Sequence, residues 1–257
     1  MSKYVVIGDL HCREVWKQIV EKESDADKFI FLGDYTCPRE IKYDDPTDAC
    51  GFLYHVLDFK DQNPDKVILL RGNHDNQSLG YYWARCNPSD HPKVKEYWQT
   101  EDVKNWFLNN TQWIYQIPDT NIVCSHAGCS TVFLKNVEKY LVRHGSSQYD
   151  DGTIDLEIIL ELLNTIEPNE LFGFTDDNPF DTNGESKCQP CTWIRPITLS
   201  SCSPKEIIQV VGHTPVNKGI LHWKANDNSE IWCCDALGLE NPEYLVIENG
   251  EFKICKI

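Results

Sequence analysis

Short apolar runs alternate with segments of helical spacing in the N-terminal part of the chain. The runs at residues 4–7, 29–32 and 67–70 are rich in Val, Ile, Leu and Phe, and they predict buried strands. Between them, residues 13–23 and 47–59 carry apolar side chains at the spacing of one helix face. This alternation predicts a sheet whose strands present polar residues at their carboxyl ends, where ligands of open α/β sheets bind.

The middle of the chain is predicted to be mainly helical, and the C-terminal part is predicted to be rich in strands. The later elements are a helical region at 79–108 with a break near Asn87-Pro88, a hairpin at 113–117 and 121–124, helices at 131–144 and 154–166, strands at 207–211, 219–223 and 230–234, and a hairpin at 244–254. A polar segment at 169–190 is predicted to be a loop and a candidate lid. Since the sequence has no internal repeat and no low-complexity linker, residues 1–257 are predicted to form one domain.

Composition sets the size of the core and the sign of the surface charge. The 257 residues are 41% hydrophobic, which is enough to fill one large core and excludes disorder as the main state. Since 24 Lys and Arg stand against 40 Asp and Glu, the formal net charge is −16. Such acidity argues against a nucleic-acid clamp and against a polybasic membrane binder. It also disfavours phosphorylated substrates unless cations dominate the field at the site.

The N-terminus and the cysteines bear on the location of the protein. The first apolar run is too short for a signal-peptide core, and no later stretch reaches about eighteen apolar residues. We therefore expect a cytoplasmic protein whose twelve cysteines are mostly free thiols. The spacing of Cys188 and Cys191 leaves a structural zinc site open as an alternative, with Cys202 or the pair Cys233 and Cys234 as further ligands.

Two carboxylates, one amide and three imidazoles follow predicted strands: Asp9, His11, Asp34, Asn73, His126 and His213. These are ligand types of hard and first-row divalent metals. Asp9 and His11 are two residues apart on an extended segment, so both side chains can meet one ion. Asp34 follows the neighbouring strand, where a carboxylate can bridge two ions. Each residue alone is more often part of a turn or an ordinary histidine, so the metal-site prediction rests on the whole set.

Five motifs in order carry a resemblance to a known family. They are Gly8-Asp9-Leu10-His11, Gly33-Asp34-Tyr35, Arg71-Gly72-Asn73-His74-Asp75, Ser125-His126-Ala127-Gly128 and Gly212-His213-Thr214-Pro215. The series resembles the calcineurin-like metallophosphoesterases, and more narrowly their phosphoprotein phosphatase branch, which contains Ser/Thr phosphatases and diadenosine tetraphosphatases. It runs from Lys3 to about Gly238, which is nearly the whole chain.

This resemblance implies an α/β (α+β) fold of four layers, in which two mixed β-sheets pack face to face with helices outside. It also implies two divalent metal ions, with manganese as the first expectation and iron, zinc, nickel or magnesium as alternatives. By analogy, the first metal would be held by Asp9, His11 and Asp34, and the second by Asp34, Asn73, His126 and His213. A hydroxide that bridges the two ions would attack phosphorus in line.

The same resemblance assigns catalytic and phosphate-binding residues. Asp34 would be the bridging carboxylate, and His74 would be the general acid that protonates the leaving alkoxide. Arg71 and Arg195 stand where the family places arginines that clamp phosphate, the latter in a Trp-Ile-Arg element similar to that of bacterial and phage members. Asp235 is a candidate for support of the site.

The sequence departs from the family pattern after Asp34. Protein phosphatases continue through an Asp-Arg-Gly element, whose Asp supports the catalytic histidine and whose Arg grips phosphate. Here Cys37 occupies the position of that Asp and Pro38 that of the Arg, with Arg39 one residue late. The support of His74 is therefore in doubt, and Arg39 becomes a candidate phosphate ligand only if its side chain turns into the site.

The predicted function is that of a metal-dependent phosphomonoesterase, most similar to protein Ser/Thr phosphatases. Pro215 stands where many phosphodiesterases carry a second histidine, which favours the phosphatase and tetraphosphatase branch. A hydrolase of dinucleoside tetraphosphates or other nucleotides is the alternative of the same class. A non-catalytic binding scaffold is the alternative of another class, motivated by Cys37 and Pro38. The expected partner is a phosphorylated protein or a small phosphate ester, with no nucleic acid and no membrane.

Overall fold

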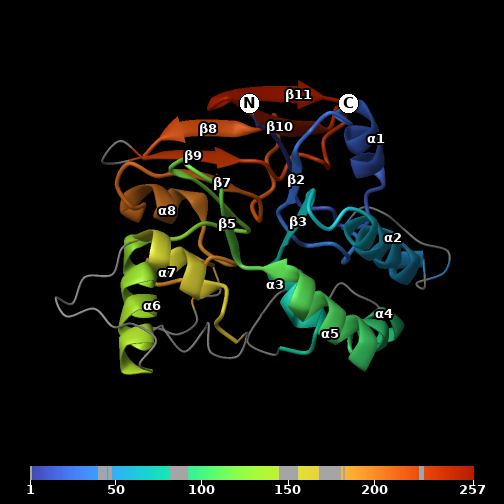
Figure 1. Ribbon diagram of the computed structural model, residues 1–257, viewed down its shortest axis with the longest axis horizontal. Coiled ribbons are helices and arrows are strands. Elements are labelled where there is room, and N and C mark those ends of the chain that lie inside the picture. Colours follow the sequence, from blue (N-terminus) through green and yellow to red (C-terminus); the bar gives the residue numbers. More distant parts are fainter. Residues whose placement is uncertain are drawn as a thin grey trace.

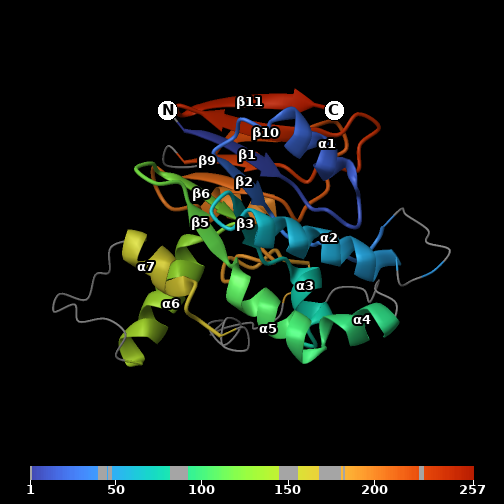
Figure 2. The ribbon, with the colours of Figure 1, turned by 45° about the vertical axis from the view of Figure 1, so that its right-hand side comes forward.

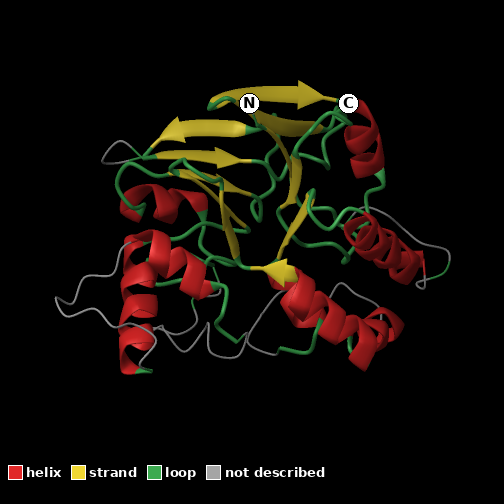
Figure 3. Cartoon of the chain, in the orientation of Figure 1, coloured by secondary structure: helices red, strands yellow, loops and turns green. Residues whose placement is uncertain are grey.

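Two mixed β-sheets lie face to face at the centre of the molecule (Figures 1 and 3). The computed structural model describes residues 2–39, 45, 48–81, 92–144, 156–167, 181, 183–225 and 229–257. Val6, Ile30 and Leu245 of the first sheet share one apolar cluster with Val210 and Ile231 of the second. The two sheets therefore bury their inner faces against each other.

The first sheet has the strand order β11-β10-β1-β2-β3-β4. Its strands are β1 (Lys3–Ile7), β2 (Lys28–Phe31), β3 (Val67–Leu70), β4 (Thr111–Gln112), β10 (Glu243–Glu248) and β11 (Glu251–Lys256). The neighbours from β1 to β4 pair in parallel, whereas β10 pairs antiparallel with β1 and β11. In β1, Val5 and Ile7 face one apolar cluster while Tyr4 and Val6 face the other. Continuous apolar strands of this kind are expected where both faces are covered.

The second sheet has the strand order β5-β6-β7-β9-β8. Its strands are β5 (Ile114–Gln116), β6 (Ile122–Ser125), β7 (Ile208–Val211), β8 (Leu221–Lys224) and β9 (Glu230–Cys233). The three central strands β6, β7 and β9 are parallel, and the outer strands β5 and β8 are antiparallel to their neighbours. Both sheets thus have parallel strands whose carboxyl ends can deliver side chains to one edge.

Helices cover the outer faces of both sheets. They are α1 (Val15–Lys22), α2 (Asp48–Gln62), α3 (Asn73–Ser78), α4 (Pro92–Trp98), α5 (Glu101–Asn110), α6 (Thr131–Arg143), α7 (Leu156–Leu163) and α8 (Pro196–Cys202). Trp16, Leu53 and Phe107 join the outer cluster of the first sheet, and Phe133 and Leu160 join that of the second. Figure 2 shows α6 and α7 on one side of the molecule and α1, α2, α4 and α5 on the other. The predicted four-layer α/β sandwich is confirmed.

The strands in the sequence pattern agree closely with those of the structure, and the differences have local causes. The prediction missed α3, which starts directly after Gly72, and α8, whose first residue Pro196 is a favoured start. It also missed β4, because two residues carry no periodicity. The predicted break near Asn87-Pro88 and most of the 169–190 segment lie outside the described residues. The single-domain boundaries stay a prediction.

The structure places no disulfide between the cysteines of its described residues. The Cys188 thiol lies 3.0 Å from the Ser186 hydroxyl. Across the described ranges, the one group of His, Cys, Asp and Glu with ligand atoms within 4.8 Å of one another contains no cysteine. The alternative of a structural zinc at Cys188 and Cys191 therefore gains no support. Among the same residues, no helix is long and apolar enough to cross a membrane.

Candidate metal centre

The carboxyl ends of five parallel strands bring the predicted ligands to one place. The ligands follow directly on their strands: Asp9 and His11 after β1, Asp34 after β2, Asn73 after β3, His126 after β6 and His213 after β7. All six side chains are buried, with exposed fractions of 0–4%. Buried polar side chains need partners, so their partners decide what the cluster can hold.

Two glycines allow the chain to pass close to the carboxylates. A Cβ on Gly72 would lie 2.1 Å from Oδ1 of Asp34, and a Cβ on Gly212 would lie 2.1 Å from Oδ1 of Asp9. Such contacts are too short for any side chain, so glycine is required where these strands end. The Gly-Asn and Gly-His pairs in the sequence are thus explained by the packing of the two acidic residues.

Three of the six residues adopt a strained backbone conformation. His11, Asp34 and His213 have φ angles of 43°, 52° and 63°, in the left-handed region that non-glycine residues rarely occupy. Strain of this kind costs on the order of 1–3 kcal/mol per residue and is commonly found at functional sites. It turns the side chains toward the cluster instead of along the sheet.

Asp9, Asp34 and His126 each have one possible ligand atom within 4.8 Å of those of the other two. Nε2 of His11 lies 3.8 Å from Asp9 Oδ2 and 3.7 Å from Asp34 Oδ2. Nε2 of His126 lies 3.5 Å from Asp34 Oδ2. Asp34 therefore stands between two imidazoles, and these side chains would hold a metal ion.

The hydrogen bonds of His11 and His126 show that Nε2 of each ring, the nitrogen that faces the cluster, carries a lone pair. Nδ1 of His11 donates to the carbonyl of Cys37 at 2.9 Å, and Nδ1 of His126 donates to that of Leu32 at 2.8 Å. Burial lowers the pKa of His11 to about 3 and lowers that of His126 as well, so both rings are neutral at pH 7. A neutral ring that donates through Nδ1 has an unprotonated Nε2.

The Nε2 lone pairs of these two rings therefore face other hydrogen-bond acceptors inside the cluster. Nε2 of His126, which carries a lone pair, lies 2.9 Å from Oδ1 of Asn73, whereas Nδ1 of His213 can donate to the same oxygen at 2.9 Å. Nε2 of His11 and Oδ2 of Asp34 have no hydrogen-bond partner among the described residues. Acceptors that converge without a donor repel one another unless a cation lies among them. The residues present thus fit divalent metal ions, which nitrogen and oxygen donors of this kind bind.

The carboxylates carry the negative charge of this cluster. Burial raises the pKa of Asp34, but the four surrounding histidines, when they are protonated at low pH, outweigh it and hold the pKa below its ordinary value. Burial raises the pKa of Asp9, and the nearby Asp235 and Asp34 carboxylates raise it further. Two buried carboxylates side by side are unfavourable without positive charge, which again favours cations at this place.

His74 lies at the rim of the cluster. It is half-buried, unlike the predicted ligands, and its backbone N–H donates to Asp34 Oδ1 at 2.9 Å. Its ring meets the His11 ring edge-on with 5.4 Å between centroids. Cys37, which stands at the family position of a supporting Asp, uses its carbonyl to hold His11. This contact uses the backbone, so it does not depend on the side chain at position 37.

Arg39 and Arg195 face this cluster from two sides. Nη1 of Arg39 lies 3.2 Å from Oδ2 of Asp235. Partial burial lowers the pKa of Arg39, but Asp9, Asp235 and Asp34 raise it above its usual value, so their fields reach this guanidinium. Nη1 of Arg195 donates to the Thr214 hydroxyl at 3.2 Å, directly beside the predicted ligand His213. Arg39 thus lies against Asp235, and its contact with phosphate stays a prediction.

Arg71 has different surroundings. Its Nε donates to Oγ1 of Thr111, and its Nη2 donates to the carbonyls of Leu108 and Thr111, at 2.7–2.9 Å. Its guanidinium also lies 4.7 Å from the centroid of the Trp113 ring. These contacts join β3 to α5 and β4. The phosphate contact of Arg71 stays a prediction. The hydrogen bonds of its guanidinium stabilise the packing of α5 and β4 against the end of β3.

Asp75 was not singled out by the sequence, yet its carboxylate holds the ends of two strands. It accepts backbone N–H groups of Asp34, Tyr35 and Gly72 at 2.8–2.9 Å, and its side chain is fully buried. These bonds fix the left-handed turn at Asp34. The available signal was an acidic residue in the first turn of a helix, but two of its three partners lie about forty positions away in the chain.

We expect Asp75→Ala to lower the free energy of unfolding by about 3 kcal/mol, because it leaves three buried donors unpaired. Urea unfolding measures the change. Asp58→Ala is the matched control, since Asp58 bonds an exposed Gln62 in the same helix, and we expect a change within about 0.5 kcal/mol. Equal losses in the two variants would contradict the role of Asp75.

The fold and the donor set together define a class: α/β sandwiches that hold divalent metals at the carboxyl ends of their strands. A family model described as calcineurin-like phosphoesterase matches residues 2–241, and the chain belongs to this family. Membership implies a phosphoester hydrolase with a metal centre. The resemblance found in the sequence is thereby confirmed.

Solved structures give the same fold. The chain is similar to the cold-active protein-tyrosine phosphatase of a psychrophilic Shewanella species, with 17% identity, 100% of this chain and 80% of that chain covered, and a TM-score of 0.58. A protein serine/threonine phosphatase from Saccharomyces cerevisiae is 12% identical, with 100% and 79% covered and a TM-score of 0.53. No curated protein matches the sequence. Likeness at these identities shows the fold alone.

Proposed function

We propose that the protein is a metal-dependent phosphomonoesterase that acts on phosphorylated Ser and Thr residues of proteins. The observation that carries this proposal is the buried group of converging acceptors around Asp34, with an imidazole and two guanidinium groups at its rim. Acceptors without donors require cations, and cations with arginines attract phosphate. Membership of the calcineurin-like phosphoesterases supports the reaction class.

Two divalent ions, with manganese as the first expectation, would be held by Asp9, His11, Asn73, His126 and His213 with Asp34 between them. When bound, such ions polarise a phosphate oxygen and lower the pKa of water, which supplies a nucleophile at neutral pH. The side chains of the site would bind the phosphate, orient it and protonate the leaving oxygen. The backbone N–H of His74 holds the Asp34 carboxylate, and the bond from Nδ1 of His11 to the Cys37 carbonyl fixes the His11 ring.

Arg195 and Arg39 would bind the oxygens of the phosphate. Thr214 and the Asn183 carbonyl hold Arg195 through Nη1 and Nε, which leaves Nη2 for a ligand. Asp235 holds Arg39 through Nη1. His74, half-buried at the rim, would then donate a ring N–H proton to the leaving oxygen of a serine or threonine, which is otherwise expelled as an alkoxide.

A monoester on a protein suits the charge of the molecule better than a polyphosphate does. The net charge of −16 repels polyanions at a distance, and the buried Asp235 adds a carboxylate close to Asp9. One phosphate needs only the local field of the metals and arginines. We expect the protein to act in the cytoplasm, consistent with its buried free thiols.

The substrate is tested by comparing kcat/KM for phosphoserine, phosphothreonine and phosphotyrosine peptides, diadenosine tetraphosphate and bis-para-nitrophenyl phosphate, each with Mn²⁺, Mg²⁺, Zn²⁺, Ni²⁺ or Fe²⁺. We expect the phosphoserine and phosphothreonine peptides to be turned over at least about tenfold better than the dinucleotide and the diester. A preference for diadenosine tetraphosphate would assign the nucleotide alternative instead. A preference for phosphotyrosine would retain the monoesterase and replace its substrate residue.

A further inference from the structure

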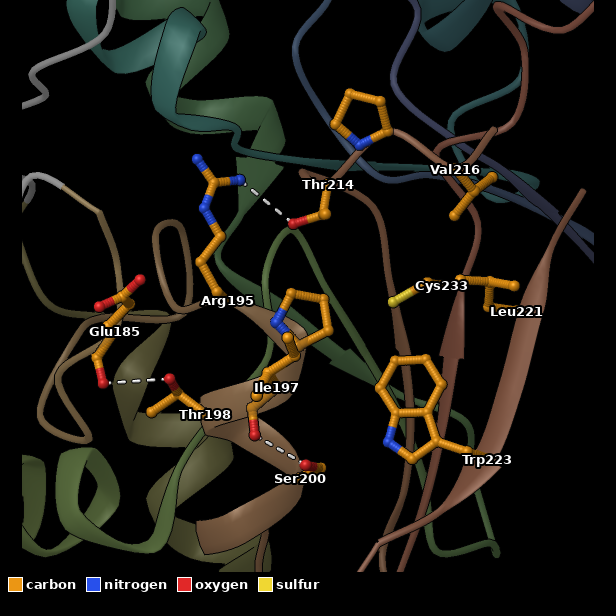
Figure 4. Close-up of a pocket in the computed structure, with 12 residues that line it drawn as sticks. Glu185, Arg195, Ile197, Thr198, Ser200, Thr214, Val216, Leu221, Trp223 and Cys233 are labelled. Atoms are coloured by element: carbon orange, nitrogen blue, oxygen red, sulfur yellow. Dashed lines mark hydrogen bonds between the residues drawn. The ribbon is translucent and has the colours of Figure 1, made fainter. Parts of the chain in front are cut away.

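An apolar cavity opens beside the candidate metal centre, between α8 and the strands β8 and β9 (Figure 4). Its volume is about 720 Å³, within the range of roughly 300–1,000 Å³ that is typical of ligand clefts. Pro196 and Ile197 of α8 form one wall, and Leu221 and Trp223 of β8 form the other, with Val216 on the same side as Leu221. We call this cavity the apolar subsite.

The apolar subsite is continuous with the place proposed for phosphate. Arg195 and Thr214 both line it, and Nη1 of Arg195 donates to the Thr214 hydroxyl at 3.2 Å (Figure 4). Thr214 directly follows the predicted ligand His213 in the chain. The guanidinium of Arg195 also lies 5.7 Å from the Trp193 ring, which in turn lies 5.4 Å from the His213 ring. One guanidinium thus stands at the junction of a cationic site and an apolar cavity.

The cavity offers apolar contact and few free polar groups. The Thr198 hydroxyl donates to the Glu185 carbonyl at 3.0 Å, and the Ser200 hydroxyl donates to the Ile197 carbonyl at 2.7 Å. Meanwhile Ile197 is 86% exposed and Leu221 is 48% exposed, which is unfavourable for large apolar side chains without a partner. A sugar or a nucleobase would find few partners for its polar atoms, whereas an aliphatic or aromatic group would be desolvated on both sides.

We propose that the apolar subsite binds an aliphatic or aromatic side chain next to the phosphorylated residue of a peptide substrate. The inference rests on the proposed function and adds a specificity determinant to it. A peptide joins the two required groups, a phosphate for Arg195 and an apolar side chain for α8 and β8, at a fixed covalent distance. Burial of that side chain would contribute to transition-state binding because the phosphate is held at the same time.

The test uses phosphoserine peptides with alanine at every other position and a single leucine moved from two residues before to two residues after the phosphoserine. We expect leucine at one of these positions to raise kcat/KM about tenfold over the all-alanine peptide. In Leu221→Asp and in Ile197→Ser, that ratio falls toward one. Val142→Asp is the matched control, since Val142 is a 53% exposed apolar residue of α6, and it keeps the tenfold ratio.

Several results would overturn the inference. A ratio near one at every position of leucine would show that the cavity does not contact the substrate. A ratio that survives both Leu221→Asp and Ile197→Ser would place the preference elsewhere. A change of oligomeric state in Leu221→Asp with an unchanged ratio would assign the cavity to contacts between copies of the chain. If no peptide is hydrolysed while para-nitrophenyl phosphate is, the proposed function itself fails, and the inference falls with it.

Discussion

We expect Asp34→Asn to lower kcat/KM for phosphate esters by about 10³-fold, because a group that stabilises charge in the transition state is lost. Oδ2 of Asp34 lies 3.7 Å from Nε2 of His11 and 3.5 Å from Nε2 of His126. That oxygen has no hydrogen-bond partner among the described residues. The amide of Asn is nearly isosteric but has no charge, so it cannot bridge two cations. The variant should therefore fold and fail to bind metal.

Calorimetric titration with Mn²⁺ and hydrolysis of para-nitrophenyl phosphate measure the two consequences of Asp34→Asn separately. Asp58→Asn is the control, because Asp58 is an acidic residue of α2 whose carboxylate bonds only an exposed Gln62 in the contacts described. Normal metal binding and turnover in Asp34→Asn would contradict the assignment of this carboxylate as the bridge.

His74→Asn is expected to lower kcat on a phosphoserine peptide by about 10²–10⁴-fold, the usual contribution of a general acid. The loss should be much smaller on para-nitrophenyl phosphate, whose leaving group needs no proton. Metal binding should be retained, because the predicted ligands are buried and His74 lies at the rim. This pattern separates proton donation from a merely structural role.

His55→Asn serves as the control for His74, since His55 is an exposed histidine of α2. Equal losses on the two substrates would contradict the general-acid role. If the unmodified protein binds metal and hydrolyses neither ester, the alternative of a non-catalytic scaffold takes the place of the proposed enzyme.

The sequence predicts the candidate ligands because they lie at strand ends. The apolar run before Asp9 and the one before Asp34 mark two strands of one sheet, and parallel neighbours must bring their carboxyl ends together. That step needs no knowledge of side-chain packing. The same reasoning finds His126 and His213, which follow the parallel strands β6 and β7 of the second sheet.

The parts that the sequence does not predict depend on contacts between distant residues. The approach of Arg39 to Asp235 joins positions 196 residues apart, and nothing in the local pattern indicates it. Asp75 likewise acts on strand ends that precede it by about forty residues. The apolar subsite exists because α8, which periodicity did not reveal, packs near β8 and β9. Such features arise from tertiary packing and require coordinates.

The central claim is that the strand-end cluster is a dinuclear metal centre that hydrolyses phosphate monoesters. The most direct test titrates chelator-treated protein with Mn²⁺ by calorimetry and follows para-nitrophenyl phosphate hydrolysis in the same samples. We predict that about two ions bind per chain and that hydrolysis rises with their binding. Full hydrolysis in the presence of chelator, or no binding of any divalent cation, would contradict the claim.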